Sequence, residues 1–433
     1  PRVLFAGLAL TVLAWFAALW RLGRVVLGEG ALAGVLLLAA TPYVLAITHY
    51  ARMDALFAAL ICLSWASFHR AVAPGDGPDR RAMVAGFAWS AGAVMVKGPF
   101  GAALPLAALA AQAVRRRMPL ADGSVAVGAG LLLAVVVAWA GGIVLAEGPG
   151  YFARLIGGQI VGRTLDGEGI AGAFRYVVTL PLVLLPWSLL VLAAPCGLRH
   201  ALRGTGPDGA DPGYLAICAG TGFLILSAVG EKHEYYLLPI LGPLALLAGV
   251  ALPRLAAPAR RRMRWMVAGG TGIFGATLAL GRWLPVEAGD YAAAIARLWP
   301  AGVLALVLAA ALVALPRVRL VPLMLAGQTA VFLLAALRAY PALDPIQSPR
   351  AIAEPMRAYV SDGYAPGIRH GIGGVFAYHL GTHYAALPRA AGIAGWLAQH
   401  PRAVIALPAA DWTKAALPND LTPVACPRFV GVG

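Results

Sequence analysis

The chain has 433 residues, of which 60% are hydrophobic and only 12% are charged, and its formal net charge is +15. Soluble globular domains carry about 25% charged residues, so the composition excludes an ordinary soluble enzyme and indicates a polytopic helical membrane protein. The basic residues cluster in short loops between apolar runs, which is the topology signal of membrane proteins. We therefore expect no nucleic-acid partner.

About twelve apolar runs have the length needed to cross a bilayer as helices. In chain order they are residues 3–20, 31–49, 54–69, 82–97, 100–114, 125–146, 174–194, 214–229, 236–252, 265–284, 298–315 and 320–338. The runs 54–69 and 100–114 are short enough to be partly re-entrant. The pattern predicts an all-α membrane domain over residues 1–338.

Arginines occupy every second loop between these runs. They are Arg21, Arg24, Arg70, Arg80, Arg81, Arg115, Arg116, Arg117, Arg199, Arg203, Arg254, Arg260, Arg261, Arg262, Arg264, Arg317 and Arg319. By the positive-inside rule these loops are cytoplasmic, so loops 49–54, 97–100, 147–172 and 231–235 are external. Pro1 then lies outside the membrane, and we expect at least one earlier membrane helix to be absent from this sequence.

The C-terminal residues 339–433 are more polar and contain no apolar run of spanning length. We predict strands at 371–378 and 403–407, and helices at 348–360 and 391–400. These elements indicate a small external α/β domain.

The stretch GEKHEYYLLP at residues 230–239 lies between two long apolar runs. It contains in direct succession Glu231, Lys232, His233, Glu234, Tyr235 and Tyr236. Ionisable groups at a bilayer boundary are candidates for function. The alternative is an ordinary polar connection between two helices.

Lysine is rare in this chain, because only three of the 34 Lys and Arg residues are lysines. Lys97 and Lys232 both lie at predicted external ends of membrane helices, where the topology rule requires no cation. A compact ammonium suits a phosphate oxygen as a point charge. The alternative is that both side chains snorkel towards lipid headgroups.

Further charged residues lie on the predicted external face. Arg52 and Asp54 occur in the sequence HYARMD, where they can form an ion pair, and where Asp54 can also cap a helix. Arg163 lies in the long loop 147–172 and is another external cation that the positive-inside rule does not explain.

Together these residues predict a cationic cluster at the bilayer surface. Its members are Arg52, Lys97, Arg163 and Lys232, with the carboxylates of Asp54 and Glu234 and the phenol of Tyr236. Such a cluster suits an anionic lipid headgroup such as a polyprenyl phosphate, to which a tyrosine adds a neutral hydrogen-bond donor.

The sequence has no Walker A loop, Rossmann fingerprint, HExxH or GxSxG motif, so nucleotide-driven chemistry is not indicated. The four cysteines are scattered without CxxC spacing and suggest neither a zinc site nor a disulfide framework. A divalent metal stays open as a cofactor. His49 and His233 are the candidate ligands, although interfacial packing is the expected role of each.

Four stretches resemble landmarks of the GT-C fold membrane glycosyltransferases of the aminoarabinose-transferase (ArnT-like) and protein O-mannosyltransferase-like group. They are ARMDALFAALICLSW, VKGPFGAALP, LLPWSLL and EKHEYYLLPILGPLALLAG, in the family's order over most of the chain. The resemblance implies a transferase that takes a sugar from a polyprenyl-phosphate carrier. The acceptor would be a lipid, glycan or protein at the external face of a bacterial inner membrane.

The resemblance also implies roles for individual residues. The family's Lys-x-x-x-Tyr element matches Lys232 and Tyr236, and the arginine of its long external loop is matched by Arg163. The Lys-Gly-Pro lysine is matched by Lys97, and these four residues are expected to bind the donor phosphate. Asp54 matches the Asp after the Ala-Arg pair and is the candidate catalytic carboxylate. The expected supporting residues are Arg52, His233, Glu234 and Tyr235.

The first external loop of the family carries an acidic pair that includes its expected catalytic base. This sequence starts at what resembles the second helix, so that loop is absent, and we expect the sequence to be truncated. One alternative is a non-catalytic relative that binds lipid phosphate without the base. Another is a lipid or solute transporter, which would need charges at membrane depth rather than at one face.

Overall fold

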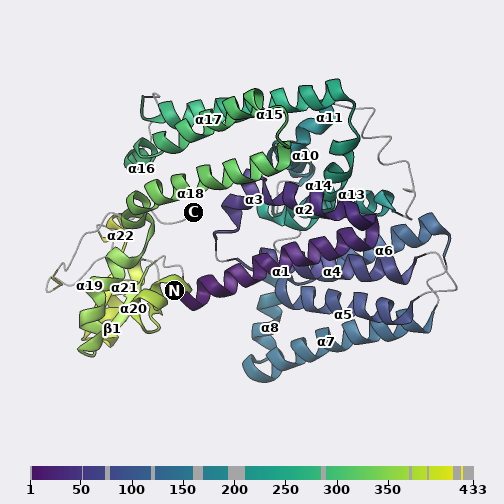
Figure 1. The fold of residues 1–433 in the computed structure, drawn as a ribbon. Helices are drawn as coiled ribbons and strands as arrows, with labels where there is room; N and C mark the ends of the chain where they lie inside the picture. The colour runs from purple at the N-terminus through teal and green to yellow at the C-terminus, as the bar shows by residue number, and fades with distance from the viewer. Residues whose placement is uncertain are drawn as a thin grey trace. The chain divides into compact units, whose positions relative to one another are not determined.

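The computed structural model describes residues 2–50, 52–73, 79–118, 122–158, 169–193, 210–283, 289–369, 373–387, 390–412 and 421–422. The chain divides into two compact units, which are described separately (Figure 1). The first comprises Pro1–Gly275 and Leu304–Phe332, and the second comprises Ala276–Val303 and Leu333–Gly433.

A helix lies within each of the predicted apolar runs. The helices that lie wholly or partly in the first unit are α1 (Arg2–Leu27), α2 (Ala31–Ala39), α3 (Pro42–Ile47), α4 (Asp54–Ala71), α5 (Arg80–Lys97), α6 (Phe100–Arg116), α7 (Gly123–Glu147), α8 (Pro149–Leu155), α10 (Gly169–Val183), α11 (Leu190–Ala193), α13 (Pro212–Ala228), α14 (Leu238–Arg254), α15 (Ala257–Leu280), α17 (Trp299–Ala314) and α18 (Leu320–Gln347). A short 3-10 turn, η4 (Glu234–Leu237), precedes α14.

Within the described part of the chain, four helical segments are long and apolar enough to cross a membrane, or up to six if each of two bent pairs is one span. The four are Val3–Ala39, Gly123–Glu147, Glu234–Arg254 and Leu320–Gln347, and the bent pairs are Phe174–Val183 with Trp187–Ala193 and Gly289–Ala296 with Trp299–Ala314. This supports a multi-pass membrane protein, but it does not confirm about twelve spans. Helices α6 and α13, for example, have 17 residues each, which is at the lower limit for a spanning helix.

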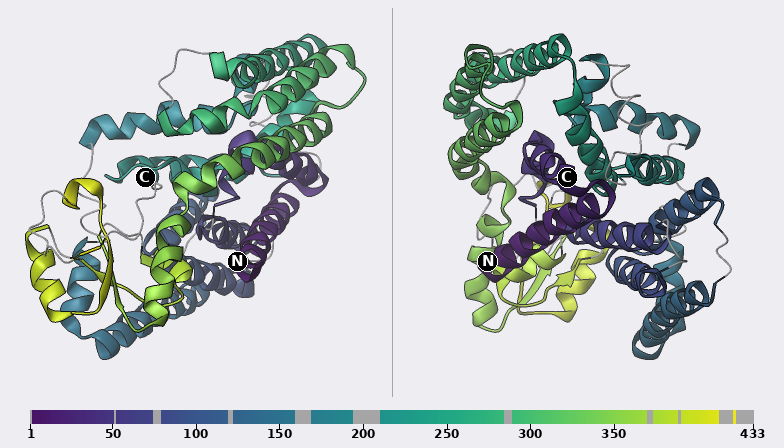
Figure 2. Two further views of the ribbon diagram at one scale, coloured as in Figure 1. Left: turned by 90° about the vertical axis from the view of Figure 1, so that its left-hand side faces the viewer. Right: turned by 45° about the vertical axis from the view of Figure 1, so that its right-hand side comes forward.

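The helices of the first unit bring three distant parts of the sequence to one place. Helix α4 packs against α1 and α5, and α14 packs against α2, α4 and α13 (Figure 2). A continuous core of buried side chains joins these helices and includes Trp15, Trp65 and Trp187. The start of α4, the end of α5 and the start of α14 can therefore share one site.

Glycines allow α2 and α14 to approach each other at backbone contact. A Cβ atom on Gly34 would lie 2.5 Å from the Cα of Leu246, and one on Gly249 would lie 2.4 Å from the backbone nitrogen of Gly34. Small residues permit this close approach in membrane helices. The glycine enrichment of the sequence thus contributes directly to helix packing.

We expect Gly249→Ala to destabilise the protein by about 1–3 kcal/mol, because the added methyl group would overlap backbone atoms of α2. The midpoint of thermal unfolding in detergent micelles should fall. The matched control is Gly130→Ala in α7, where no atom lies within 4 Å of the added Cβ. This control should leave the midpoint unchanged or raise it, and equal midpoints for the two variants would contradict the packing.

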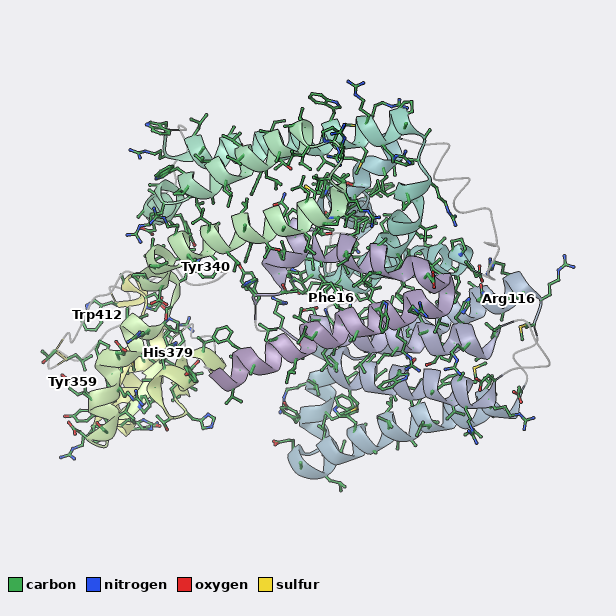
Figure 3. The ribbon with its side chains drawn as sticks, viewed as in Figure 1. Phe16, Arg116, Tyr340, Tyr359, His379 and Trp412 are labelled. Carbon is green, nitrogen blue, oxygen red and sulfur yellow. The ribbon has the colours of Figure 1, made fainter. Side chains whose placement is uncertain are left out.

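The second unit contains a three-stranded parallel sheet with the strand order β2-β1-β3. The strands are β1 (Ala365–Ile368), β2 (Ala385–Ala386) and β3 (Ala403–Ala406), and the accompanying helices are α16 (Ala292–Ala296), α19 (Arg350–Ser361), α20 (Gly373–Leu380), α21 (Ala390–Gln399) and α22 (Ala409–Trp412). Figure 3 labels Tyr359 of α19, His379 of α20 and Trp412 of α22. This unit has the α/β character that the sequence predicts for the C-terminal residues.

Three of the four elements predicted in the C-terminal residues are confirmed, namely the helices near 348–360 and 391–400 and the strand at 403–407. The strand predicted at 371–378 is wrong, because Gly373–Leu380 forms α20. Phe376 and Leu380 are both buried and lie four residues apart, which is the spacing of one helix face. Strands β1 and β2 were not predicted from the sequence.

Candidate functional site

Asp54 is the first residue of α4 and is buried, with its side chain only 5% exposed. One carboxylate oxygen accepts a hydrogen bond from Nε of Arg52 at 3.0 Å, and the other pairs with Nζ of Lys97 at the end of α5. A buried carboxylate requires such partners to offset its lost hydration. The predicted ion pair with Arg52 is therefore present, and Asp54 fixes the positions of two cations.

Two tyrosine rings of η4 lie against these cations. The Arg52 guanidinium carbon is 3.6 Å from the centre of the Tyr235 ring, and the Lys97 ammonium is 4.4 Å from the centre of the Tyr236 ring. Both distances are typical of cation–π contacts. The structure thus brings together five of the residues singled out in the sequence, from loop 49–54, α5 and the stretch at 230–239.

Glu231 belongs to the same cluster, although the sequence analysis did not assign it to the site. Its carboxylate lies 3.0 Å from Nε2 of His233, and it accepts a hydrogen bond from the Tyr236 hydroxyl at 3.3 Å. The His233 ring stacks on the Tyr235 ring at a centroid distance of 4.8 Å. The position of Glu231 in the EKHEYY stretch is a signal that could have included it.

Lys232 is buried and directs its ammonium group towards the end of α13. Nζ donates to the carbonyl of Ser227 at 2.8 Å and to that of Leu226 at 3.2 Å, and it also contacts the carbonyl of Val229. The last carbonyls of a helix lack intrahelical partners, and a lysine can satisfy them. The binding of donor phosphate by Lys232 stays a prediction.

Helix α10 supports the stretch at 230–239 through two neighbouring residues. The Tyr176 hydroxyl donates to the carbonyl of His233 at 2.9 Å and accepts from its backbone N–H at 3.1 Å. Arg175 pairs with Glu234 at 3.4 Å, where both side chains are more than 40% exposed. Glu234, a predicted supporting residue, therefore faces Arg175, and Tyr176 is a supporting residue that the sequence analysis missed.

Two solved structures are similar to this chain. Both are of ArnT from Cupriavidus metallidurans, one bound to undecaprenyl phosphate and one in the apo state. Their TM-scores are 0.70 and 0.69, each at 21% sequence identity and covering 92% of this chain and 74% of the ArnT chain. The fold is ArnT-like GT-C. Neither a protein-family model nor a curated protein sequence matches the chain.

The ArnT-like fold agrees with the resemblance found in the sequence. Of the other predicted residues, Arg163 lies outside the described residues. His49 stacks on Phe332 at a centroid distance of 4.4 Å, and its Nδ1 lies 2.6 Å from the carbonyl of Leu45. The described residues contain no group of three or more His, Cys, Asp or Glu side chains that could hold a metal ion.

The Asp54 cluster contains two cations, Arg52 and Lys97, beside the carboxylates of Asp54 and Glu231. Partial burial acts to lower the pKa of Arg52. Its hydrogen bond to Asp54 and its electrostatic interactions with Tyr235 and Asp54 outweigh this effect and raise the pKa above its ordinary value. Arg52 is therefore a cation at any physiological pH. The cluster thus holds charged donors on Arg52 and Lys97 and a neutral donor on Tyr236, whose hydroxyl donates to Glu231.

Proposed function

We propose that this chain is a membrane glycosyltransferase that moves a sugar from a polyprenyl-phosphate carrier to a lipid, glycan or protein acceptor. The observation that carries the proposal is the cluster of Arg52, Asp54 and Lys97 beneath Tyr235 and Tyr236, in a chain with an ArnT-like fold. The solved ArnT structure that contains undecaprenyl phosphate supports this class of carrier. We further propose that the site faces the exterior of a bacterial inner membrane.

In the proposed reaction, a nucleophile of the acceptor attacks the anomeric carbon of the lipid-linked sugar. The bond from this carbon to the phosphate oxygen breaks, and polyprenyl phosphate leaves with the bonding electron pair. A carboxylate accepts the proton of the acceptor, and cations stabilise the charge on the departing phosphate. Because the carrier phosphate is the leaving group, the transfer needs no nucleotide.

We assign the donor phosphate to Lys97 and to Tyr236, whose hydroxyl would exchange Glu231 for a phosphate oxygen. Arg163 and Lys232 are further proposed ligands, and Lys232 would have to release carbonyls at the end of α13 to bind phosphate. Both oxygens of Asp54 are already engaged, one by Arg52 and one by Lys97. We therefore propose that Asp54 orients these cations towards the phosphate, which makes it a positioning residue.

Binding of undecaprenyl phosphate to the protein in detergent micelles tests this proposal. We expect the protein to bind undecaprenyl phosphate but not undecaprenol, which lacks the phosphate. Tyr236→Phe should weaken binding roughly ten- to a hundredfold, because it removes one hydrogen bond to a charged group. Tyr378→Phe, which changes an exposed tyrosine of the second unit, should leave Kd unchanged. Equal binding of the two lipids would contradict the proposal.

A further inference from the structure

Arginines gather at the opposite end of α14 from the Asp54 cluster. They are Arg254, Arg260, Arg261, Arg262, Arg264, Arg317 and Arg319, and we call them the α15 arginine cluster. No Asp or Glu occurs at residues 235–286 or 291–343 to balance them along the chain. Since α14 has 17 residues, its two ends lie about 25 Å apart, so this cluster is separate from the proposed catalytic site.

Two members of the α15 arginine cluster hold helix ends together. Arg260 donates to the carbonyl of Pro253, in the last turn of α14, at 3.3 Å. It also donates to the carbonyl of Leu255, the residue after this helix, at 2.9 Å. Arg264 donates to the carbonyl of Leu315 at 2.8 Å, immediately after α17. Helix-terminal carbonyls lack intrahelical donors, so these two arginines have a structural role and fix the base of α15.

Arg261 and Arg262 have a different environment. Both side chains are exposed, and within the described residues neither makes a hydrogen bond or an ion pair. They line an open, mainly apolar hollow on the surface of α15 together with Trp265 and Met266. Trp265 is 53% exposed. The two guanidinium groups therefore lie beside the apolar surface of Trp265 and Met266. An amphiphilic anion, which has a charged group next to an apolar chain, would complement this arrangement.

The cluster lies where candidate membrane spans end. The span Glu234–Arg254 ends directly before α15, and the span Leu320–Gln347 begins directly after Arg319. Arg264 links α15 to the connection between α17 and α18, because it also contacts the carbonyl of Val318. Ends of spans lie at the level of lipid headgroups, where tryptophan is also enriched.

We propose that Arg261 and Arg262 bind the phosphate headgroup of an anionic phospholipid, with its acyl chain lying over Trp265 and Met266. A guanidinium presents a planar fork of donors that matches two phosphate oxygens. Basic pockets beside membrane helices suit anionic headgroups in this way. A zwitterionic lipid fits less well, because its own cationic group would meet two arginines.

The test uses the full chain in detergent micelles with three probes, namely phosphatidylglycerol, phosphatidylcholine with the same acyl chains, and inorganic phosphate. Bound lipid is counted by native mass spectrometry, and the unfolding midpoint is measured in parallel. We expect retention of phosphatidylglycerol and a higher midpoint with this lipid alone. The double variant Arg261→Gln/Arg262→Gln should bind it on the order of tenfold more weakly or worse.

The matched control is Arg21→Gln/Arg24→Gln in α1, which removes the same charge from two exposed arginines and should keep wild-type lipid binding. Equal weakening in both double variants would show a diffuse charge effect and overturn the proposal. Equal stabilisation by phosphatidylcholine or by inorganic phosphate would also overturn it. The comparison of probes on the wild-type protein decides the question even if the double variant does not fold.

Discussion

Lys97→Met is expected to lower kcat/KM for sugar transfer roughly a hundred- to a thousandfold, the loss typical when one fixed electrostatic donor is removed from a reaction centre. The Lys97 ammonium is held by Asp54 and lies over the Tyr236 ring at 4.4 Å. It is therefore oriented before the donor binds. The measurement is the initial rate of transfer from a polyprenyl-phosphate-linked sugar by the protein in phospholipid vesicles.

The same substitution also weakens the fold, because Asp54 keeps only Arg52 as a partner. The double variant Asp54→Asn/Lys97→Met separates the two effects, since it removes both charges of the pair. We expect it to recover most of the stability lost by Lys97→Met but none of the transfer activity. Arg282→Met, which removes an exposed cation, should leave the rate unchanged. A double variant with wild-type rate would exclude a chemical role for Lys97.

Asp211→Asn is expected to have the largest effect on stability, a loss of about 3–5 kcal/mol, because it leaves two arginines without their buried partner. The Asp211 carboxylate is 7% exposed and accepts from Arg116 at 2.8 Å, from Gln112 at 3.1 Å and from Arg115. Figure 3 labels Arg116, at the end of α6. Asp211 also caps α13 through the backbone N–H of Tyr214.

This network makes the effect of Asp211→Asn dependent on pH. Burial acts to raise the pKa of Asp211, but the His69 ring at 3.6 Å and hydrogen bonds from the two arginines and Gln112 hold it far below its ordinary value. An unfolded Asp has a pKa of about 3.9. The stabilisation is therefore fully present above about pH 5, and it is lost as the pH falls through the lower folded pKa.

The difference in unfolding midpoint between wild type and Asp211→Asn should accordingly be large at pH 7 and smaller at pH 3. The matched control is Asp122→Asn at the start of α7, where Arg80 lies at 3.9 Å and is 80% exposed. This control should change the midpoint little, because exposed ion pairs contribute little. A difference for Asp211→Asn that does not change with pH would contradict the assigned network.

Apolar runs predicted the positions of the helices, because the length and composition of each run are local properties. The predicted number of about twelve membrane spans was not confirmed, because helices such as α6 and α13 are at the lower limit of spanning length. The strand predicted at 371–378 failed for a related reason. The apolar residues of this segment fit both the two-residue period of a strand and the 3.6-residue period of a helix. The segment forms a helix, in which Phe376 and Leu380 are buried on the same face.

Unusual residue chemistry marked part of the Asp54 cluster in the sequence, whereas other contacts depend on tertiary placement. Arg52, Lys97, Tyr235 and Tyr236 lie together in the structure, and their role in binding phosphate stays a prediction. Arg115 and Arg116 carried only a topology signal in the sequence, yet in the structure they bind Asp211. The contacts of Lys232 with carbonyls at the end of α13 could not be predicted from the sequence either, because they depend on how the chain turns after that helix.

The fate of a polyprenyl-phosphate-linked sugar in vesicles that contain the protein tests the proposed function most directly. Donors that carry a pentose or a hexose would be supplied in turn with a lipid, a glycan and a protein acceptor. Mass spectrometry would quantify donor, undecaprenyl phosphate and glycosylated acceptor. We expect one donor to be consumed, with equal amounts of undecaprenyl phosphate and product formed, and Lys97→Met to slow this roughly a hundred- to a thousandfold. Donor that binds but is not consumed, or that is consumed equally by Lys97→Met, would contradict the proposed function.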